Sequence, residues 1–134
     1  MADIRPVTDA FAVAPQLSPS DLTEAAALGY RLVVNNRPDG EAPGQPTAAE
    51  METAARAAGL DYVHIPVVGG PGPAQVAAMS EALTASGAKT LAFCRSGTRS
   101  IITWSLGRRA AGADVDQLIA QAAEAGYDLS AVLG

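Results

Sequence analysis

The residues best suited to chemistry lie in one short loop around the single cysteine of this 134-residue chain. The loop follows the apolar segment 90–93 and reads Cys94-Arg95-Ser96-Gly97-Thr98-Arg99-Ser100. A thiolate is a strong nucleophile, and arginines are the residues that best hold anionic groups. This composition therefore points to covalent chemistry at a cysteine on an anionic substrate.

A strand before the loop and a helix after it would place Cys94 where anions bind. Ligands gather at the carboxyl ends of parallel strands, and backbone amides at a helix N-terminus favour negative charge. The same field, strengthened by Arg99, favours the reactive thiolate over the thiol. Gly97 allows the backbone angles that a tight loop demands. Ser100 is expected either to cap the helix or to hydrogen-bond the Cys94 sulfur.

Plainer interpretations of the same loop stay open. Cys94 could be a buried, inert small hydrophobe. Arg99 could be a solvated side chain, although a cation at a helix N-terminus is unfavourable unless it holds an anion. Arg95 either recruits substrate or points into solvent. Ser96 and Thr98 complete the set of expected anion contacts.

Further charged candidates lie in the turn-rich segment 36–46. Arg37 either binds an anionic substrate or pairs with Asp39 or Glu41. The two carboxyl groups could supply a general acid, although proline and glycine on either side of Asp39 form a natural turn. His64, the only histidine, is expected at a core or edge position of a strand. With one histidine and one cysteine, we expect no metal site and no cofactor.

Segments typical of strands alternate with segments typical of helices. The expected strands are residues 11–13, 31–35, 62–65 and 90–93, and the expected helices are 18–29, 47–58, 76–87, 100–111, 114–125 and a turn near 129–133. Ser18 and Pro19 predict one helix start, and Thr47 with Glu50 predicts a capping box. The alternation predicts an α/β fold with a mostly parallel sheet of four to five strands, flanked by helices on both faces. The apolar segment 90–93 is expected at its centre.

Composition narrows the class of protein. Hydrophobic residues make up 49% and charged residues 17%, which fits one folded domain over residues 1–134 and excludes a disordered chain. No apolar run reaches the roughly 18 residues of a membrane span, and the first ten residues do not resemble a secretory signal. The net charge of −5 argues against nucleic-acid binding. One cysteine cannot form a disulfide framework, so a cytoplasmic location is expected.

The chain resembles the DUF442 family, the phosphatase-like domain also found fused to beta-lactamase-like hydrolases. The resemblance covers residues 10–110 and rests on Gln16-Leu17-Ser18-Pro19, Asp21-Leu22, the run Val33-Val34-Asn35-Asn36-Arg37-Pro38-Asp39-Gly40-Glu41, Gln45-Pro46, Gly59-Leu60-Asp61-Tyr62, Ile65-Pro66-Val67, and the cysteine loop with Trp104. It implies a cysteine-phosphatase-like fold, and activity either as a phosphatase or as a sulfurtransferase. Trp104 is expected in the core, or else as a wall of the pocket.

Loop spacing distinguishes these two activities. Four residues separate Cys94 from Arg99, as is typical of rhodanese sulfurtransferases, whereas cysteine phosphatases have five. One residue fewer removes an amide, which suits a terminal sulfane sulfur better than a phosphoryl group with three equatorial oxygens. No aspartate lies between Tyr62 and Cys94 to protonate a leaving group, as it would in phosphatases of this type. Phe93 stands where those enzymes commonly have histidine.

The main hypothesis is therefore a rhodanese-like sulfurtransferase. The Cys94 thiolate would accept a sulfane sulfur as a persulfide and pass it to a thiol or another nucleophile. The family implies small anionic donors, thiosulfate or a low-molecular-weight persulfide such as glutathione persulfide, and a persulfide-oxidising enzyme is a candidate partner. One alternative is a phosphatase with a phosphocysteine intermediate and Asp39 or Glu41 as the acid. A second is a non-catalytic anion-binding module.

Overall fold

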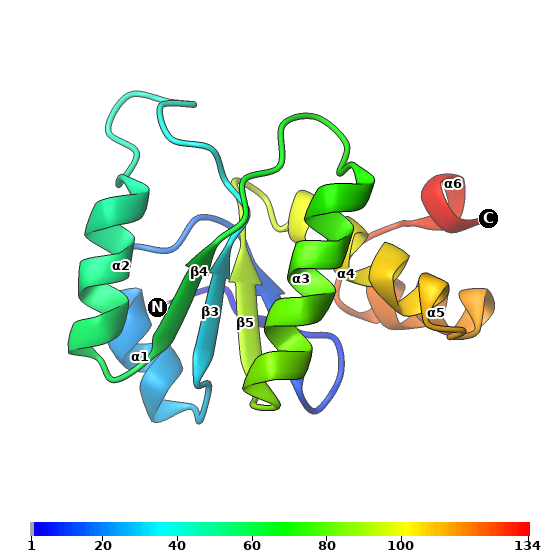
Figure 1. The fold of residues 1–134 in the computed structure, drawn as a ribbon, viewed down its shortest axis with the longest axis horizontal. Helices are drawn as coiled ribbons and strands as arrows, with labels where there is room; N and C mark the ends of the chain where they lie inside the picture. The colour runs from blue at the N-terminus through cyan, green and yellow to red at the C-terminus, as the bar shows by residue number, and fades with distance from the viewer. Residues whose placement is uncertain (1) are drawn as a thin grey trace.

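A five-stranded sheet forms the centre of the computed structural model, which describes residues 2–134 (Figure 1). In sheet order the strands are β1 (Arg5–Pro6), β2 (Phe11–Ala14), β5 (Thr90–Phe93), β3 (Leu32–Asn35) and β4 (Asp61–His64). β2, β5, β3 and β4 run parallel, and β1 pairs antiparallel with β2. The predicted α/β class, the mostly parallel sheet and the central place of segment 90–93 are confirmed.

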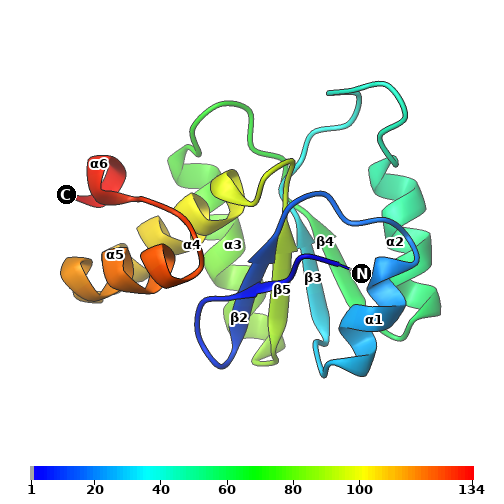
Figure 2. The ribbon, with the colours of Figure 1, turned by 180° about the vertical axis from the view of Figure 1, so that it is seen from behind.

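Helices cover both faces of the sheet (Figures 1 and 2). One face carries α1 (Asp21–Ala27) and α2 (Ala48–Ala57), and the other carries α3 (Pro73–Ser86), α4 (Thr98–Ala110), α5 (Val115–Glu124) and α6 (Ser130–Leu133). In β5, Ala92 packs toward the second group, while Leu91 and Phe93 pack toward the first. Side chains of a strand alternate between faces, so a strand buried on both faces carries apolar side chains in both directions. Thr90, the polar residue of β5, is buried and donates its hydroxyl to the Ala88 carbonyl at 3.0 Å.

Local signals set most of the element boundaries. Thr47 Oγ1 accepts from the Glu50 N–H at 3.1 Å, and a Glu50 carboxylate oxygen accepts from the Thr47 N–H at 3.2 Å. This is the predicted capping box at the start of α2. Asp114 caps α5 in a similar way by accepting from the Gln117 N–H at 2.9 Å.

Three helix starts differ from the sequence prediction. α3 begins at Pro73 rather than at residue 76, because proline suits the first turn of a helix. α1 begins at Asp21, because Ser18 and Asp21 instead close a turn before the helix: the Asp21 carboxylate accepts from the Ser18 N–H at 2.8 Å. α4 begins at Thr98, two residues before the predicted start at Ser100. The left-handed backbone of Gly97, with φ +91°, ends the loop and allows the helix to begin immediately.

Trp104 packs in the core from α4, as expected. Its ring stacks on Phe11 with centroids 4.8 Å apart and an angle of 6° between planes. The contact joins α4 to the start of β2, at the end of the sheet opposite to Cys94. Within residues 2–134, no helix combines the length and apolar character needed to cross a membrane.

Candidate active site

Cys94 directly follows the central strand β5 and is fully buried. Its sulfur accepts a hydrogen bond from the Gly97 N–H, with an N···S distance of 3.1 Å. The thiol therefore faces the loop that opens α4, a helix of 13 residues. The positive end of the helix dipole and the loop amides together stabilise a negative charge at this point.

Arg99 lies in the first turn of α4, and Glu41 holds its guanidinium from one side. Nη1 and Nη2 donate to the two Glu41 carboxylate oxygens, both at 2.8 Å. Nη1 also donates to the carbonyl of Val67 at 2.8 Å. These contacts engage three of the five N–H donors of the guanidinium. The Nε–H and the second Nη2–H form a remaining fork, which matches the geometry of two oxygens of an oxyanion.

Glu41 is shared between two arginines. Arg37, only 4% exposed, donates from Nε to a Glu41 oxygen at 2.9 Å and from Nη1 to Gln16 at 3.1 Å. Two guanidinium groups thus face one carboxylate, which leaves one positive charge in excess. Such an excess favours binding of an anion. Of the two roles expected for Arg37, the ion pair with Glu41 is the one that the structure shows.

The same ion pairs fix the charge of Glu41. Hydrogen bonds from Arg99, with a smaller contribution from Arg37, lower the pKa of the Glu41 carboxyl from 4.5 to about 2 against the opposing effect of burial. The hydrogen bond with Glu41 raises the pKa of Arg99, which therefore stays charged. Glu41 carries no proton at neutral pH, so in this arrangement it cannot act as the general acid that the sequence suggested.

Asp39 also has a structural contact that accounts for its side chain. It is exposed, and its carboxylate accepts from the Ala48 N–H at 2.7 Å, in the first turn of α2. Negative charge is favourable at that helix end. The turn interpretation of Asp39 is the one that the geometry favours. The Asp39 side chain is thus held at the start of α2, whereas that of Glu41 bonds Arg99.

The remaining loop side chains contribute unequally. Arg95 is exposed, and its carbonyl accepts from the Gln16 N–H at 3.2 Å. The hydroxyls of Ser96 and Thr98 contact each other at 2.9 Å, so the loop offers an anion mainly its backbone amides. Ser100 is fully buried and neither caps α4 nor bonds the sulfur. Its hydroxyl is buried and has no hydrogen-bond partner within residues 2–134.

Three residues contribute to the site in roles that the sequence did not predict. Gln16 supports Arg37, and the Val67 carbonyl holds Arg99. Tyr127, near the C-terminus, donates to the Ser96 carbonyl at 2.8 Å. Gln16 and Val67 lie in segments that carry the family resemblance, which gave them no role, and Tyr127 lies outside those segments. His64 contacts the Arg37 carbonyl at 2.8 Å from the end of β4, which matches the expected structural position.

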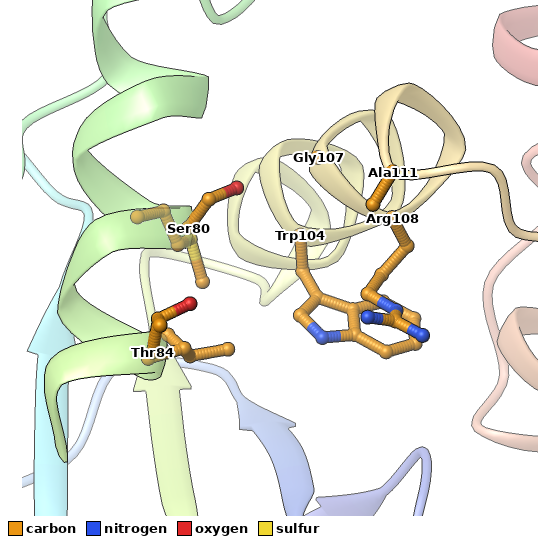
Figure 3. A pocket seen from close by; sticks show the side chains of 8 residues that line it. Ser80, Thr84, Trp104, Gly107, Arg108 and Ala111 are labelled. Atoms are coloured by element: carbon orange, nitrogen blue, oxygen red, sulfur yellow. The ribbon is translucent and has the colours of Figure 1, made fainter. Parts of the chain in front are cut away.

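A separate cavity of about 140 Å³ lies between α3 and α4 (Figure 3). Ser80 and Thr84 of α3 line it opposite Trp104 and Arg108 of α4. Cys94 and the loop after it are not among its walls. Trp104 therefore lines this cavity rather than a pocket at the cysteine. Among the described side chains, no cluster of three or more His, Cys, Asp or Glu residues could hold a metal ion.

Comparison with known sequences identifies relatives of the chain. The family model "Beta-lactamase hydrolase-like protein, phosphatase-like domain" matches residues 3–113. A beta-lactamase hydrolase-like protein of Xylella fastidiosa (strain Temecula1) is 35% identical over 101 residues, which are 75% of this chain and 23% of the relative. One of Agrobacterium fabrum is 34% identical over 102 residues, 75% of this chain and 24% of the relative. The chain thus spans about a quarter of these curated relatives.

Solved structures share the fold. A candidate phosphatase from Neisseria meningitidis superposes with a TM-score of 0.85 at 30% identity, over 98% of this chain and 94% of that one. Kinase associated phosphatase superposes with a TM-score of 0.69 at 16% identity, over 90% and 80% of the two chains. The cysteine-phosphatase-like fold is confirmed. These relatives support the phosphatase alternative better than the sulfurtransferase that loop spacing suggested.

Replacing Glu41 by Gln should make the free energy of unfolding less dependent on pH in the acid range. Its pKa is about 2 when folded and about 4.5 ordinarily, so the unfolded chain binds this proton first as the pH falls. The stabilisation is complete above pH 4.5 and is lost toward pH 2. Thermal unfolding between pH 7 and pH 2 should therefore show a smaller acid-dependent loss in Glu41→Gln than in the wild type.

Glu52→Gln is the matched control for that series, because Glu52 is exposed and its ion pair with Arg56, at 3.4 Å, lies on the surface of α2. It should retain the wild-type acid dependence. Parallel profiles for the wild type and Glu41→Gln would contradict the assigned ion pairs.

Replacing Gly97 by Ala should destabilise the fold by about 2–3 kcal/mol, because strain at a positive φ adds to a collision. A Cβ there would strike the Tyr127 hydroxyl. Gly44, with φ +77° and open space around it, is the control for strain alone and should cost about 1 kcal/mol as alanine. Urea denaturation measures both. Equal losses would show that Gly97 is not tightly packed.

Proposed function

We propose that this chain, which belongs to the phosphatase-like domain family of the beta-lactamase hydrolase-like proteins, is a cysteine-dependent phosphatase. The observation that carries the proposal is the hydrogen-bonded Cys94 sulfur, placed at the N-terminus of α4 beside Arg99, with which it interacts. A nucleophile and an oxyanion clamp are the two parts that phosphoryl transfer through an enzyme thiolate needs.

The first step forms a sulfur–phosphorus bond. The Cys94 thiolate attacks phosphorus in line with the leaving oxygen, the P–O bond breaks, and the electron pair leaves with that oxygen. Loop amides and the Arg99 fork stabilise the charge on the equatorial oxygens. The product is a phosphocysteine and a free phenolate or alkoxide.

The second step returns the enzyme to its starting state. Water attacks phosphorus, the S–P bond breaks, and its electron pair restores the thiolate. Inorganic phosphate leaves, and the proton lost by the attacking water goes to solvent or to the phosphate itself. The excess positive charge of Arg37 and Arg99 over Glu41 would retain the anion during both steps.

The substrate class follows from the leaving group. Glu41 is ionised, Asp39 binds the start of α2, and the loop between β4 and α3 contains no carboxylate. A phenol ionises near pH 10, so a phenolate departs far more easily than an alkoxide. Aryl phosphates, of which phosphotyrosine is one, are therefore the proposed substrates.

A second candidate is the rhodanese-like sulfurtransferase, favoured by the four-residue spacing between Cys94 and Arg99 and by the same missing acid. The Cys94 thiolate would attack the outer sulfur of thiosulfate, the S–S bond would break, and sulfite would leave with the electron pair. An acceptor thiolate would then attack the outer sulfur of the Cys94 persulfide. Neither departure needs a proton.

A paired turnover assay separates these functions, with Cys94→Ser as the control in each arm. One arm offers an aryl phosphate, and the other offers thiosulfate or glutathione persulfide with a thiol or cyanide acceptor. Turnover that depends on Cys94 in the phosphate arm alone is the expected result. Turnover in the sulfur arm alone would replace the phosphatase with the sulfurtransferase. No turnover in either arm would support the remaining alternative, a non-catalytic anion-binding module.

The rate should depend steeply on the leaving group. Across a series of aryl and alkyl phosphates, kcat should fall as the pKa of the leaving alcohol rises, because no placed acid compensates, and general acids ordinarily supply about 10²–10⁴-fold. Asp39→Asn should leave that slope unchanged. A shallow slope that steepens in Asp39→Asn would identify Asp39 as the acid.

A further inference from the structure

Tyr127 reaches the cysteine loop from a part of the chain that the family model does not cover. The model match ends at residue 113, and Tyr127 follows α5. In Figures 1 and 2 the segment between α5 and α6 runs beside α4. Tyr127 is only 8% exposed, and its hydroxyl donates to the Ser96 carbonyl at 2.8 Å.

That carbonyl and the Gly97 N–H belong to one peptide unit. A peptide unit is planar and trans, so its C=O and N–H point in opposite directions. The carbonyl side is held by Tyr127, and the N–H side donates to the Cys94 sulfur at 3.1 Å. Fixing the carbonyl therefore fixes the direction of the hydrogen bond to the nucleophile.

Gly97 makes this restraint necessary. Glycine populates positive and negative φ with similar ease, so a peptide next to it can rotate at low cost. The space beside Gly97 is filled by the Tyr127 ring and by the Ala14 carbonyl, where a side chain would otherwise lie. Tyr127 therefore supplies, from outside the loop, the rigidity that Gly97 lacks.

The Tyr127 side chain is itself well held. The Arg5 guanidinium lies 5.2 Å from the centre of its ring, and Arg5 also pairs with Asp3 at 2.9 Å. Burial, with Arg5 opposing it, raises the pKa of the Tyr127 hydroxyl. The hydroxyl thus remains protonated near neutral pH and keeps the proton that it donates to Ser96.

We propose that Tyr127 is a positioning residue that locks the Ser96–Gly97 peptide, so that its N–H points at the Cys94 sulfur. The inference concerns the thiolate, so it stands whether Cys94 receives a phosphoryl group or a sulfur atom. Arg5, Asp3 and the Cys94 thiolate act electrostatically on Tyr127, and Arg99 interacts with the thiolate. Removing only the Tyr127 hydroxyl leaves all of these charged groups in place.

The test compares Tyr127→Phe with Tyr30→Phe in the full chain. Tyr30 is 3% exposed and packs on the α1 and α2 face, so its variant loses the same atom far from the loop. The readouts are the pH titration of the Cys94 thiolate by its ultraviolet absorbance, with the corresponding Cys94→Ser chain subtracted, and exchange of the Gly97 amide proton. Thermal unfolding of each variant reports folding.

In Tyr127→Phe we expect the thiolate to form at a pH higher by about half a unit or more, because one hydrogen bond to the charged form is weakened. The Gly97 amide should exchange faster. For the aryl phosphate, kcat should fall about tenfold while KM stays nearly constant, since positioning is lost rather than binding. Tyr30→Phe should match the wild type in all three measurements.

Wild-type titration and amide exchange in Tyr127→Phe would overturn the proposal. So would equal changes in both tyrosine variants, which would indicate general loosening of the fold. The titration does not depend on turnover. A failure of the phosphatase proposal would therefore appear only in the measurement of kcat and KM. A titration shift without any phosphatase activity would support the role of Tyr127 and reject the proposed substrate.

Discussion

The hydrogen bond from the Gly97 N–H to the Cys94 sulfur is the constraint on which the rest of the site depends. It requires a strand that ends directly before the cysteine, a helix that begins four residues after the cysteine, and a left-handed residue between them. The central strand β5 meets the first requirement because its neighbours β2 and β3 hold it on both sides. The apolar core thereby sets the position of the buried Cys94 sulfur.

Charge at the mouth of the site follows a second constraint. Arg37 is almost completely buried, and a buried cation needs a partner. Glu41 meets that need while also holding Arg99, and the hydrogen bonds from Arg99 lower its pKa to about 2. The carboxylate therefore organises the two arginines instead of donating a proton. This arrangement favours anions whose leaving groups need no protonation.

Signals within a few residues predicted much of this molecule. The capping box of Thr47, the apolar strand before Cys94 and the arginine after it are all local, and each was readable in the sequence. The contact of Arg99 with Glu41 spans 58 positions, and that of Tyr127 with Ser96 spans 31. Contacts of this kind depend on how helices pack onto the sheet, which no local spacing encodes. β1, with two residues, was too short to show a strand pattern.

The most direct test of Cys94 as the covalent nucleophile is to stop turnover with acid and measure the mass of the intact protein. With an aryl phosphate present, the account predicts that one phosphoryl group is added to the chain, at Cys94, and that Cys94→Ser gains none. Turnover of the aryl phosphate with an unmodified Cys94, or an adduct at another residue, would contradict it. A single sulfur atom added at Cys94 from thiosulfate, with no phosphoryl adduct, would keep the nucleophile and change the reaction.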